Sequence, residues 1–65
     1  MTEKHYTLDY WFDEEDGELH LTVYQGAKIV HVEDILGDFE NEDDIKRTCL
    51  EVASSHGFSP AVFRD

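Results

Sequence analysis

Two stretches of alternating apolar and polar residues constrain the fold of this chain more than any other feature. Residues 6–12 carry an apolar side chain at every second position, and residues 18–24 repeat the pattern. A period of two is typical of β-strands with one buried face. Between the stretches, Gly17 ends a four-residue connection and can supply the positive φ that short hairpin loops often need. The sequence therefore predicts a β-hairpin.

The register of this hairpin follows from the loop length. A loop over residues 14–17 pairs Phe12 with Leu19, and it then pairs Tyr10 with Leu21 and Leu8 with Val23. All of these apolar side chains fall on one face of the sheet without adjustment. A different register would scatter them over both faces.

A second hairpin is predicted at residues 25–28, with Gly26 first in a two-residue type II′ loop. This loop pairs Val23 with Val30 and Leu21 with Val32, and it places a third strand over about residues 28–33. The pattern is weaker there because Ile29 and Val30 are both apolar, so one of them must face outward.

Residues 34–40 are expected to form a connector, followed by a helix with Asn41 as its N-cap and acidic residues in its first turn. An apolar stripe recurs at three- and four-residue spacing over Ile45, Cys49, Val52, Ala53 and His56, with Leu50 at its margin. Gly57 suits the left-handed position after the last turn, and Pro60 prevents the helix from resuming. Residues 61–63 either form a short edge strand or pack onto the core.

These elements predict a single α+β domain over residues 1–65: a three-stranded antiparallel β-meander followed by one α-helix on one sheet face. A 65-residue chain buries only roughly 60% of the surface of its unfolded form. Since the lone Cys49 has no partner for an intramolecular disulfide, association is the remaining route to extra stability, and a homodimer is one expectation.

The lone cysteine and the absence of a signal-peptide pattern in the first ten residues indicate a cytoplasmic protein. No apolar run approaches the ~20 residues of a membrane span. The formal net charge of -11 repels nucleic acid phosphates and anionic lipids alike. We therefore expect a protein partner, basic in character, with no direct contact to nucleic acid or membrane.

No motif in the sequence indicates catalysis or a bound cofactor, so we expect a protein that is not an enzyme. Cys49 and His56 lie two helical turns apart, about 10 Å, which is too far for a nucleophile and its base. His20, His31 and Glu33 come together in the predicted register and could hold a metal ion, but an open sheet provides no supporting shell. We interpret them as polar strand residues and predict no metal site.

The sheet face away from the helix is the strongest candidate for a binding surface, because a sheet covered on one side normally has a polar second face. The alternative is that residues 58–63 fold over it. The predicted partner-binding residues on this outer face are Asp9, Trp11, His20, Tyr24, Ile29, His31 and Glu33.

Clustered carboxylates can also imitate the phosphates of a nucleic acid, although solubility or adaptation to high salt would enrich acids equally. The candidate acidic surface comprises Asp13, Glu14, Glu15, Asp16, Asp38, Glu40, Glu42, Asp43 and Asp44. In size, charge and fold plan the chain resembles small phage-encoded inhibitors of host proteins, without a shared motif. We therefore hypothesise an inhibitor of a basic, nucleic-acid-handling protein; the alternative is a homodimeric adaptor that binds through the face around Trp11.

Overall fold

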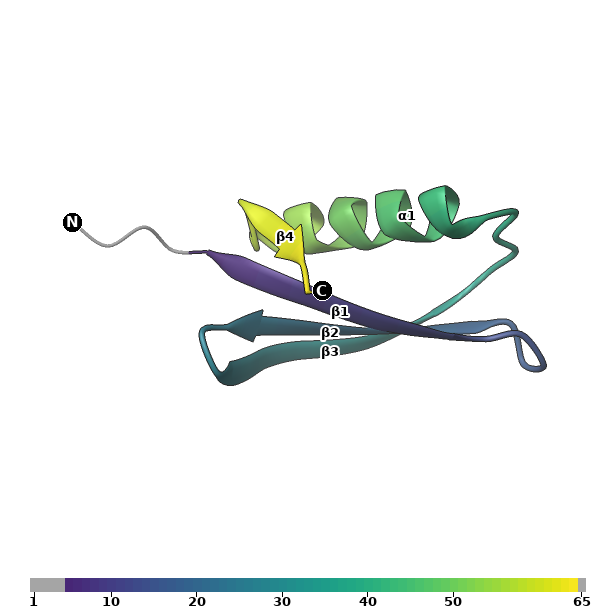
Figure 1. The fold of residues 1–65 in the computed structure, drawn as a ribbon, viewed down its shortest axis with the longest axis horizontal. Coiled ribbons are helices and arrows are strands. Elements are labelled where there is room, and N and C mark those ends of the chain that lie inside the picture. The colour runs from purple at the N-terminus through teal and green to yellow at the C-terminus, as the bar shows by residue number, and fades with distance from the viewer. Residues whose placement is uncertain (1–4, 65) are drawn as a thin grey trace.

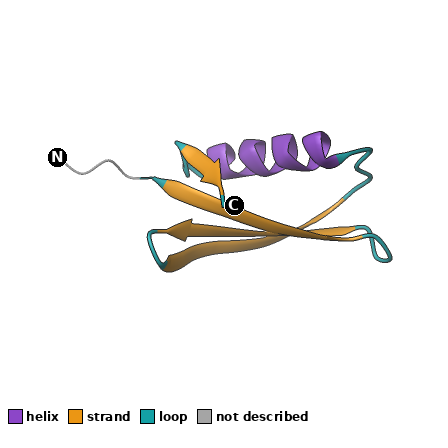
Figure 2. Cartoon of the chain, viewed as in Figure 1, coloured by secondary structure: helices purple, strands orange, loops and turns teal. Residues whose placement is uncertain are grey.

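The computed structural model describes residues 5–64, and its architecture is the predicted α+β fold. The elements in chain order are β1 (Tyr6–Asp13), β2 (Glu18–Gln25), β3 (Lys28–Leu36), α1 (Glu42–Ser55) and β4 (Ala61–Phe63). The four strands form one sheet in the order β3-β2-β1-β4, and α1 lies along one face of it (Figure 1). The first three strands are antiparallel neighbours, whereas β4 pairs with β1 in parallel, as a sheet edge (Figure 2).

The first hairpin has the predicted register. Phe12 pairs with Leu19, Tyr10 with Leu21 and Leu8 with Val23. Gly17 has a φ of 67°, the left-handed conformation that glycine adopts without steric cost. Alternation and one turn glycine were therefore sufficient to predict this half of the sheet.

The core lies between the sheet and α1. Four strand residues, Leu8, Leu19, Leu21 and Val23, are fully buried, and α1 contributes Cys49 and Ala53. Four members of the predicted stripe thus face the sheet, with Ile45 and Val52 packed at the margin of the core, whereas His56 and Leu50 are exposed. Burial of the Cys49 thiol raises its pKa to about 11, which is consistent with a packing role.

Both predicted ends of the helix are confirmed. The Asn41 side chain accepts a hydrogen bond of 3.0 Å from the backbone N–H of Asp44. At the other end Gly57 has a φ of 83°, and the N–H groups of Gly57 and Phe58 donate to the carbonyls of Ser54 and Ala53. This pair of bonds is a Schellman motif, and it holds the chain in a fixed turn after His56.

The predicted register of the second hairpin is wrong beyond its first residues. Gln25 pairs with Lys28 and Tyr24 with Ile29, as a two-residue loop at Gly26 requires, but a β-bulge then shifts the ladder by one residue. Val23 therefore pairs with His31 instead of Val30, and Leu21 pairs with Glu33 instead of Val32. The strand also continues to Leu36, three residues beyond the predicted end, so residues 34–36 are strand instead of connector.

The bulge changes which side chains of β3 face the helix. Val30 packs against the core, and His31 follows it onto the same face because the bulge adds one residue. Val32 and Leu36 consequently project from the outer face, where they are exposed. A period of two cannot reveal such an insertion, since each half of β3 alternates normally.

Candidate functional site

The outer face of the sheet, opposite α1, carries a set of exposed apolar side chains. The set comprises Trp11, Ile29, Val32, Leu36 and Val62. Their positions follow from the pairing, since each lies on the opposite side from the buried residues of its strand or of the neighbouring strand. The exposed fraction is 62% for Trp11 and Val32 and 74% for Leu36. Large apolar side chains are thus concentrated on the face that the helix leaves uncovered.

Most of this set lies along β3, the edge strand. Ile29, Val32 and Leu36 all project outward from β3, whereas the outward positions of the neighbouring β2 carry Thr22 and Tyr24 among others. At the opposite edge of the sheet, Val62 of β4 pairs with Thr7. The described residues 58–63 form or flank this edge strand, so the alternative that they fold over the outer face is wrong.

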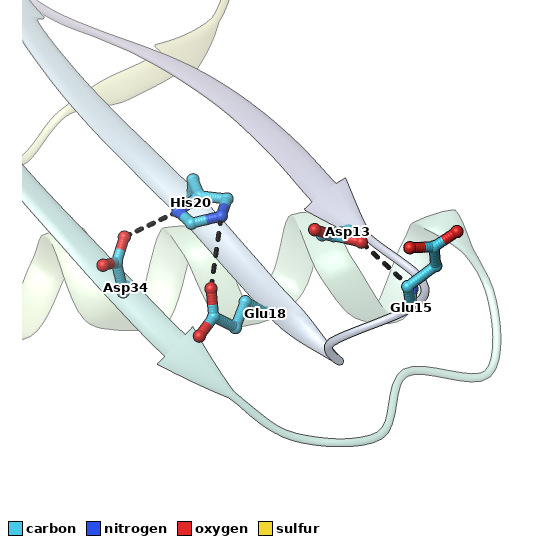
Figure 3. A network of polar contacts seen from close by, with 5 residues as sticks. All are labelled: Asp13, Glu15, Glu18, His20 and Asp34. Atoms are coloured by element: carbon cyan, nitrogen blue, oxygen red, sulfur yellow. Dashed lines mark hydrogen bonds and ion pairs between the residues drawn. The ribbon is translucent and has the colours of Figure 1, made fainter.

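Trp11 has a defined orientation on the outer face, toward the end next to the β1–β2 turn. Its ring stacks on the imidazole of His20, with centroids 5.2 Å apart and planes at 15°. His20 is itself held between two carboxylates, at 2.7 Å from Nδ1 to Asp34 Oδ1 and 3.6 Å from Nε2 to Glu18 Oε2 (Figure 3). The sequence predicted Glu33 as the neighbour of His20, and the bulge replaces it with Asp34.

A shallow hollow of about 440 Å³ lies at the other end of the outer face, beside the β2–β3 turn. It is lined by Thr7, Tyr24, Gly26, Ala27 and Arg64. The Arg64 guanidinium lies 5.4 Å from the centroid of the Tyr24 ring, a cation–π contact. This end of the face therefore combines an aromatic ring with a positive charge, in a chain that has only five lysines and arginines.

The acidic residues predicted as a separate surface converge at one end of the molecule. Residues 13–16 end β1 and begin the β1–β2 turn, and residues 38–44 cover the connector after β3 and the first turn of α1; both segments lie at the same end of the sheet (Figure 1). The Gly37 N–H donates to the Gly17 carbonyl at 3.4 Å, and Phe12 packs edge-to-face on Phe39 at 5.5 Å. We call these two acidic segments the acidic end.

Asp44 and Glu42 are partly neutralised within the acidic end, through ion pairs with Arg47 and Lys46 respectively. Glu42 also accepts a hydrogen bond of 3.0 Å from the Tyr10 hydroxyl. Burial, with this hydrogen bond, raises the Tyr10 pKa above its usual value. Residues 13–16 are all acidic, and three of the four are exposed.

Two of the predicted partner-binding residues, His31 and Glu33, lie on the helix side instead of the outer face. There they meet His56, the C-cap residue of α1. The Nε2 atoms of His31 and His56 each lie 2.9 Å from the same oxygen, Glu33 Oε1. The hydrogen bond from His31 is the largest cause of a lowered pKa at the Glu33 carboxyl; partial burial opposes it, and His56 adds to it.

The sequence pattern did not predict Val32, Leu36 and Val62 on the outer face or His56 beside His31. A signal for the first two was present in Ile35, which pairs with Leu19 and packs against the core. Had Ile35 been assigned to the buried face, alternation would have placed His31 and Glu33 on that face and Val32 and Leu36 outside.

Among the residues that the structure describes, no helix combines the length and apolar composition that a membrane crossing requires. No protein-family model matches the chain, and no curated protein and no solved structure is significantly similar to it.

Proposed function

We propose that this protein acts by binding another protein, with the outer face of the sheet as its docking surface. The observation that carries the proposal is the concentration of exposed apolar side chains on that face, from Ile29 to Leu36 along β3 and at Trp11 and Val62. A sheet with one covered face normally has a polar second face, and exposed apolar patches with polar rims are typical of interaction surfaces.

Trp11 is the expected energetic centre of this surface. Tryptophan is enriched among the residues that dominate binding energy, especially where its ring is held rigid and surrounded by other contacts. Stacking on His20, which two carboxylates hold in place, supplies this rigidity before a partner arrives. Little side-chain entropy should then be lost when Trp11 is buried.

The acidic end gives the partner its chemical character. Leu36 pairs with Glu18 directly beside the β1–β2 turn, so the apolar surface borders the acidic segments. A partner that covers both would need an apolar patch flanked by lysine or arginine. Proteins that bind nucleic acids have such basic surfaces. The specific form of the proposal is therefore an inhibitor of a basic, nucleic-acid-handling protein, present in the cytoplasm, where a lone thiol stays reduced.

A homodimeric adaptor is the second candidate, and the charge distribution along the outer face favours it. Arg64 lies at the end next to the β2–β3 turn, and the acidic residues lie at the end next to the β1–β2 turn. Two copies packed face to face in opposite directions would bring Arg64 of each near the acidic end of the other. The same apolar residues would then be buried between the copies.

The docking surface can be tested with variants that reduce an exposed apolar side chain, either on the outer face or, as a control, on α1. We would immobilise the wild-type protein and three variants, use each to capture partners from the native source, and then purify each captured protein. The variants are Trp11→Ala, Val32→Thr and the control Leu50→Ala. Leu50 is also an exposed apolar residue but lies on α1. For a genuine partner, Trp11→Ala should raise Kd by at least ~10-fold, and Leu50→Ala should leave it within about twofold.

Equal Kd values for all four proteins would contradict the docking surface. Sedimentation velocity of the wild type and Trp11→Ala separates the two candidates. A dimer that Trp11→Ala dissociates supports the adaptor, and a monomer that binds the purified partner supports the inhibitor.

The contribution of the acidic end has its own test. Glu14→Gln and Glu51→Gln each remove one exposed carboxylate, the first in the β1–β2 turn and the second on α1. If the acidic end contacts a nucleic-acid-binding groove, Glu14→Gln should weaken binding more than Glu51→Gln, duplex DNA or RNA should compete, and raised salt should weaken binding steeply. Binding that is indifferent to salt and to nucleic acid would contradict mimicry while leaving the docking surface intact.

A further inference from the structure

Three side chains with metal-binding atoms meet where the C-terminus of α1 lies against β3. His31 and Glu33 come from β3, and His56 is the C-cap of α1. One possible ligand atom from each residue lies within 4.8 Å of the others, and this is the one such group among the described residues. The cluster lies on the opposite side of the sheet from the proposed docking surface, so it is independent of that proposal.

The donor set suits a divalent transition metal ion. Imidazole nitrogens and a carboxylate oxygen are ligands of Zn²⁺, and two histidines with one glutamate form known three-ligand zinc sites. Tetrahedral Zn²⁺ with ligand bonds of about 2.0–2.1 Å requires donor atoms roughly 3.3 Å apart. Both Nε2 atoms are already directed at one point, Glu33 Oε1, at 2.9 Å. The three donor atoms lie within 4.8 Å of one another, so the two rings and the carboxylate would adjust their separations toward about 3.3 Å as the ion binds.

Local structure fixes the two histidines before any ion binds. The β-bulge turns His31 toward the helix side, where its ring packs on Phe58 with centroids 5.4 Å apart and on His56 with centroids 4.6 Å apart. The His56 backbone N–H bonds to carbonyls of the last helical turn, and the Schellman motif at Gly57 continues that restraint. The two rings thus come from elements that are rigid at this point.

The electrostatic environment also favours a cation. The C-terminus of a helix carries partial negative charge, and no lysine or arginine occupies the last turn of α1. The chain as a whole has a formal charge of -11. A cation at His56 would therefore be attracted by the helix dipole, by the Glu33 carboxylate and by the negative net charge of the whole molecule.

We propose that His31, Glu33 and His56 bind a divalent transition metal ion, with Zn²⁺ as the best fit, and that the ion ties the end of α1 to β3. The ion takes the Nε2 lone pair of each imidazole while the proton of the neutral ring sits on Nδ1, and a ring that was imidazolium releases one proton to solvent. Three protein ligands leave a fourth coordination position for water. The ion would stabilise the folded chain, because the three ligands come together only when α1 packs against the sheet.

The test is a titration of the metal-free, full-length chain with ZnCl₂, followed by calorimetry and by the imidazole resonances in NMR. One equivalent of Zn²⁺ should bind and shift the side-chain signals of His31 and His56, whereas those of His20 should not move. At a free Zn²⁺ concentration ten times Kd, Tm should rise by roughly 5–10 °C.

Variants provide the matched comparison. His31→Asn, His56→Asn and Glu33→Gln should each weaken Zn²⁺ binding by at least ~10-fold. The control His20→Asn removes a histidine that also lies beside carboxylates but on the outer face, and it should leave the Kd within about twofold. Far-UV circular dichroism checks that each variant is folded, and the NMR result on the wild type does not depend on any variant.

Absence of Zn²⁺ binding to the wild type at millimolar concentration would overturn the proposal. Movement of the His20 signals in place of those of His31 and His56, or unchanged affinity in His56→Asn, would do the same. Mg²⁺ should not displace Zn²⁺, since it prefers oxygen ligands. Equal binding of the two ions would indicate general attraction to the acidic chain and would also contradict the site.

Discussion

Glu33 shows how one residue shift changes the chemistry of a side chain. On the outer face it would be an ordinary exposed acid; on the helix side it accepts hydrogen bonds from two imidazoles. The lowered pKa of its carboxyl means that the charged form is more favourable in the folded chain than in the unfolded one. A single carboxylate thereby links protonation to the packing of α1 on β3.

Glu33→Gln tests this link in metal-free protein. Because the folded pKa lies below the ordinary value of 4.5, the stabilisation is fully present above that pH and is lost as the pH falls through the folded pKa. The substitution should cost about 0.5–1 kcal/mol of unfolding free energy near neutral pH, since the group is partly exposed, and much less at pH 3.

Urea denaturation from pH 3 to pH 7 measures this effect, with Glu51→Gln as the control for loss of one exposed carboxylate. A cost of Glu33→Gln that is the same at both ends of the pH range would contradict the role of the Glu33 charge.

The first hairpin and the ends of the helix could be predicted, because residues close in the sequence determine them. The register of β3 could not, because it depends on how both ends of the strand pack against the core. The first hairpin follows from alternation and Gly17, and the helix ends follow from Asn41 and Gly57. The second hairpin was predicted correctly at its turn and then failed at Val30, where the bulge lies. The bulge places both Val30 and Ile35 against the core. Alternation counted from one end of β3 does not predict that both residues face the same side.

Gly57→Ala tests the helix stop in isolation. A Cβ at this position would meet nothing within 4 Å, so the cost arises from the positive φ of 83° alone. We expect a loss of about 1 kcal/mol and a fall in Tm of roughly 4–8 °C, measured by thermal denaturation.

Ser54→Ala, an exposed helical substitution in the same turn, should change stability by less than ~0.5 kcal/mol. If Gly57→Ala were as stable as the wild type, the left-handed turn would not be the element that ends α1.

The whole molecule has three distinct regions, of which the sequence predicted the outer face and the acidic surface but not the cluster of His31, Glu33 and His56. Acidic segments separated by more than twenty residues meet at one end, because β3 runs on to Leu36 before the chain crosses to α1. The apolar outer face and the histidine–glutamate cluster lie on opposite sides of the sheet. Composition predicted an acidic binding protein, but only the register of β3 determines which side chains each surface presents.

NMR mapping on the labelled wild type tests most directly whether the outer face of the sheet is a protein docking surface, as we propose. The signals to follow are the Trp11 indole N–H and the methyl groups of Val32, Leu36 and Val62, observed with the purified partner or across a dilution series if the chain self-associates. We predict that these signals shift or broaden on complex formation, while the methyl groups of Leu50 on α1 do not. Perturbation of the Leu50 side alone, with the outer-face signals unchanged, would contradict the account.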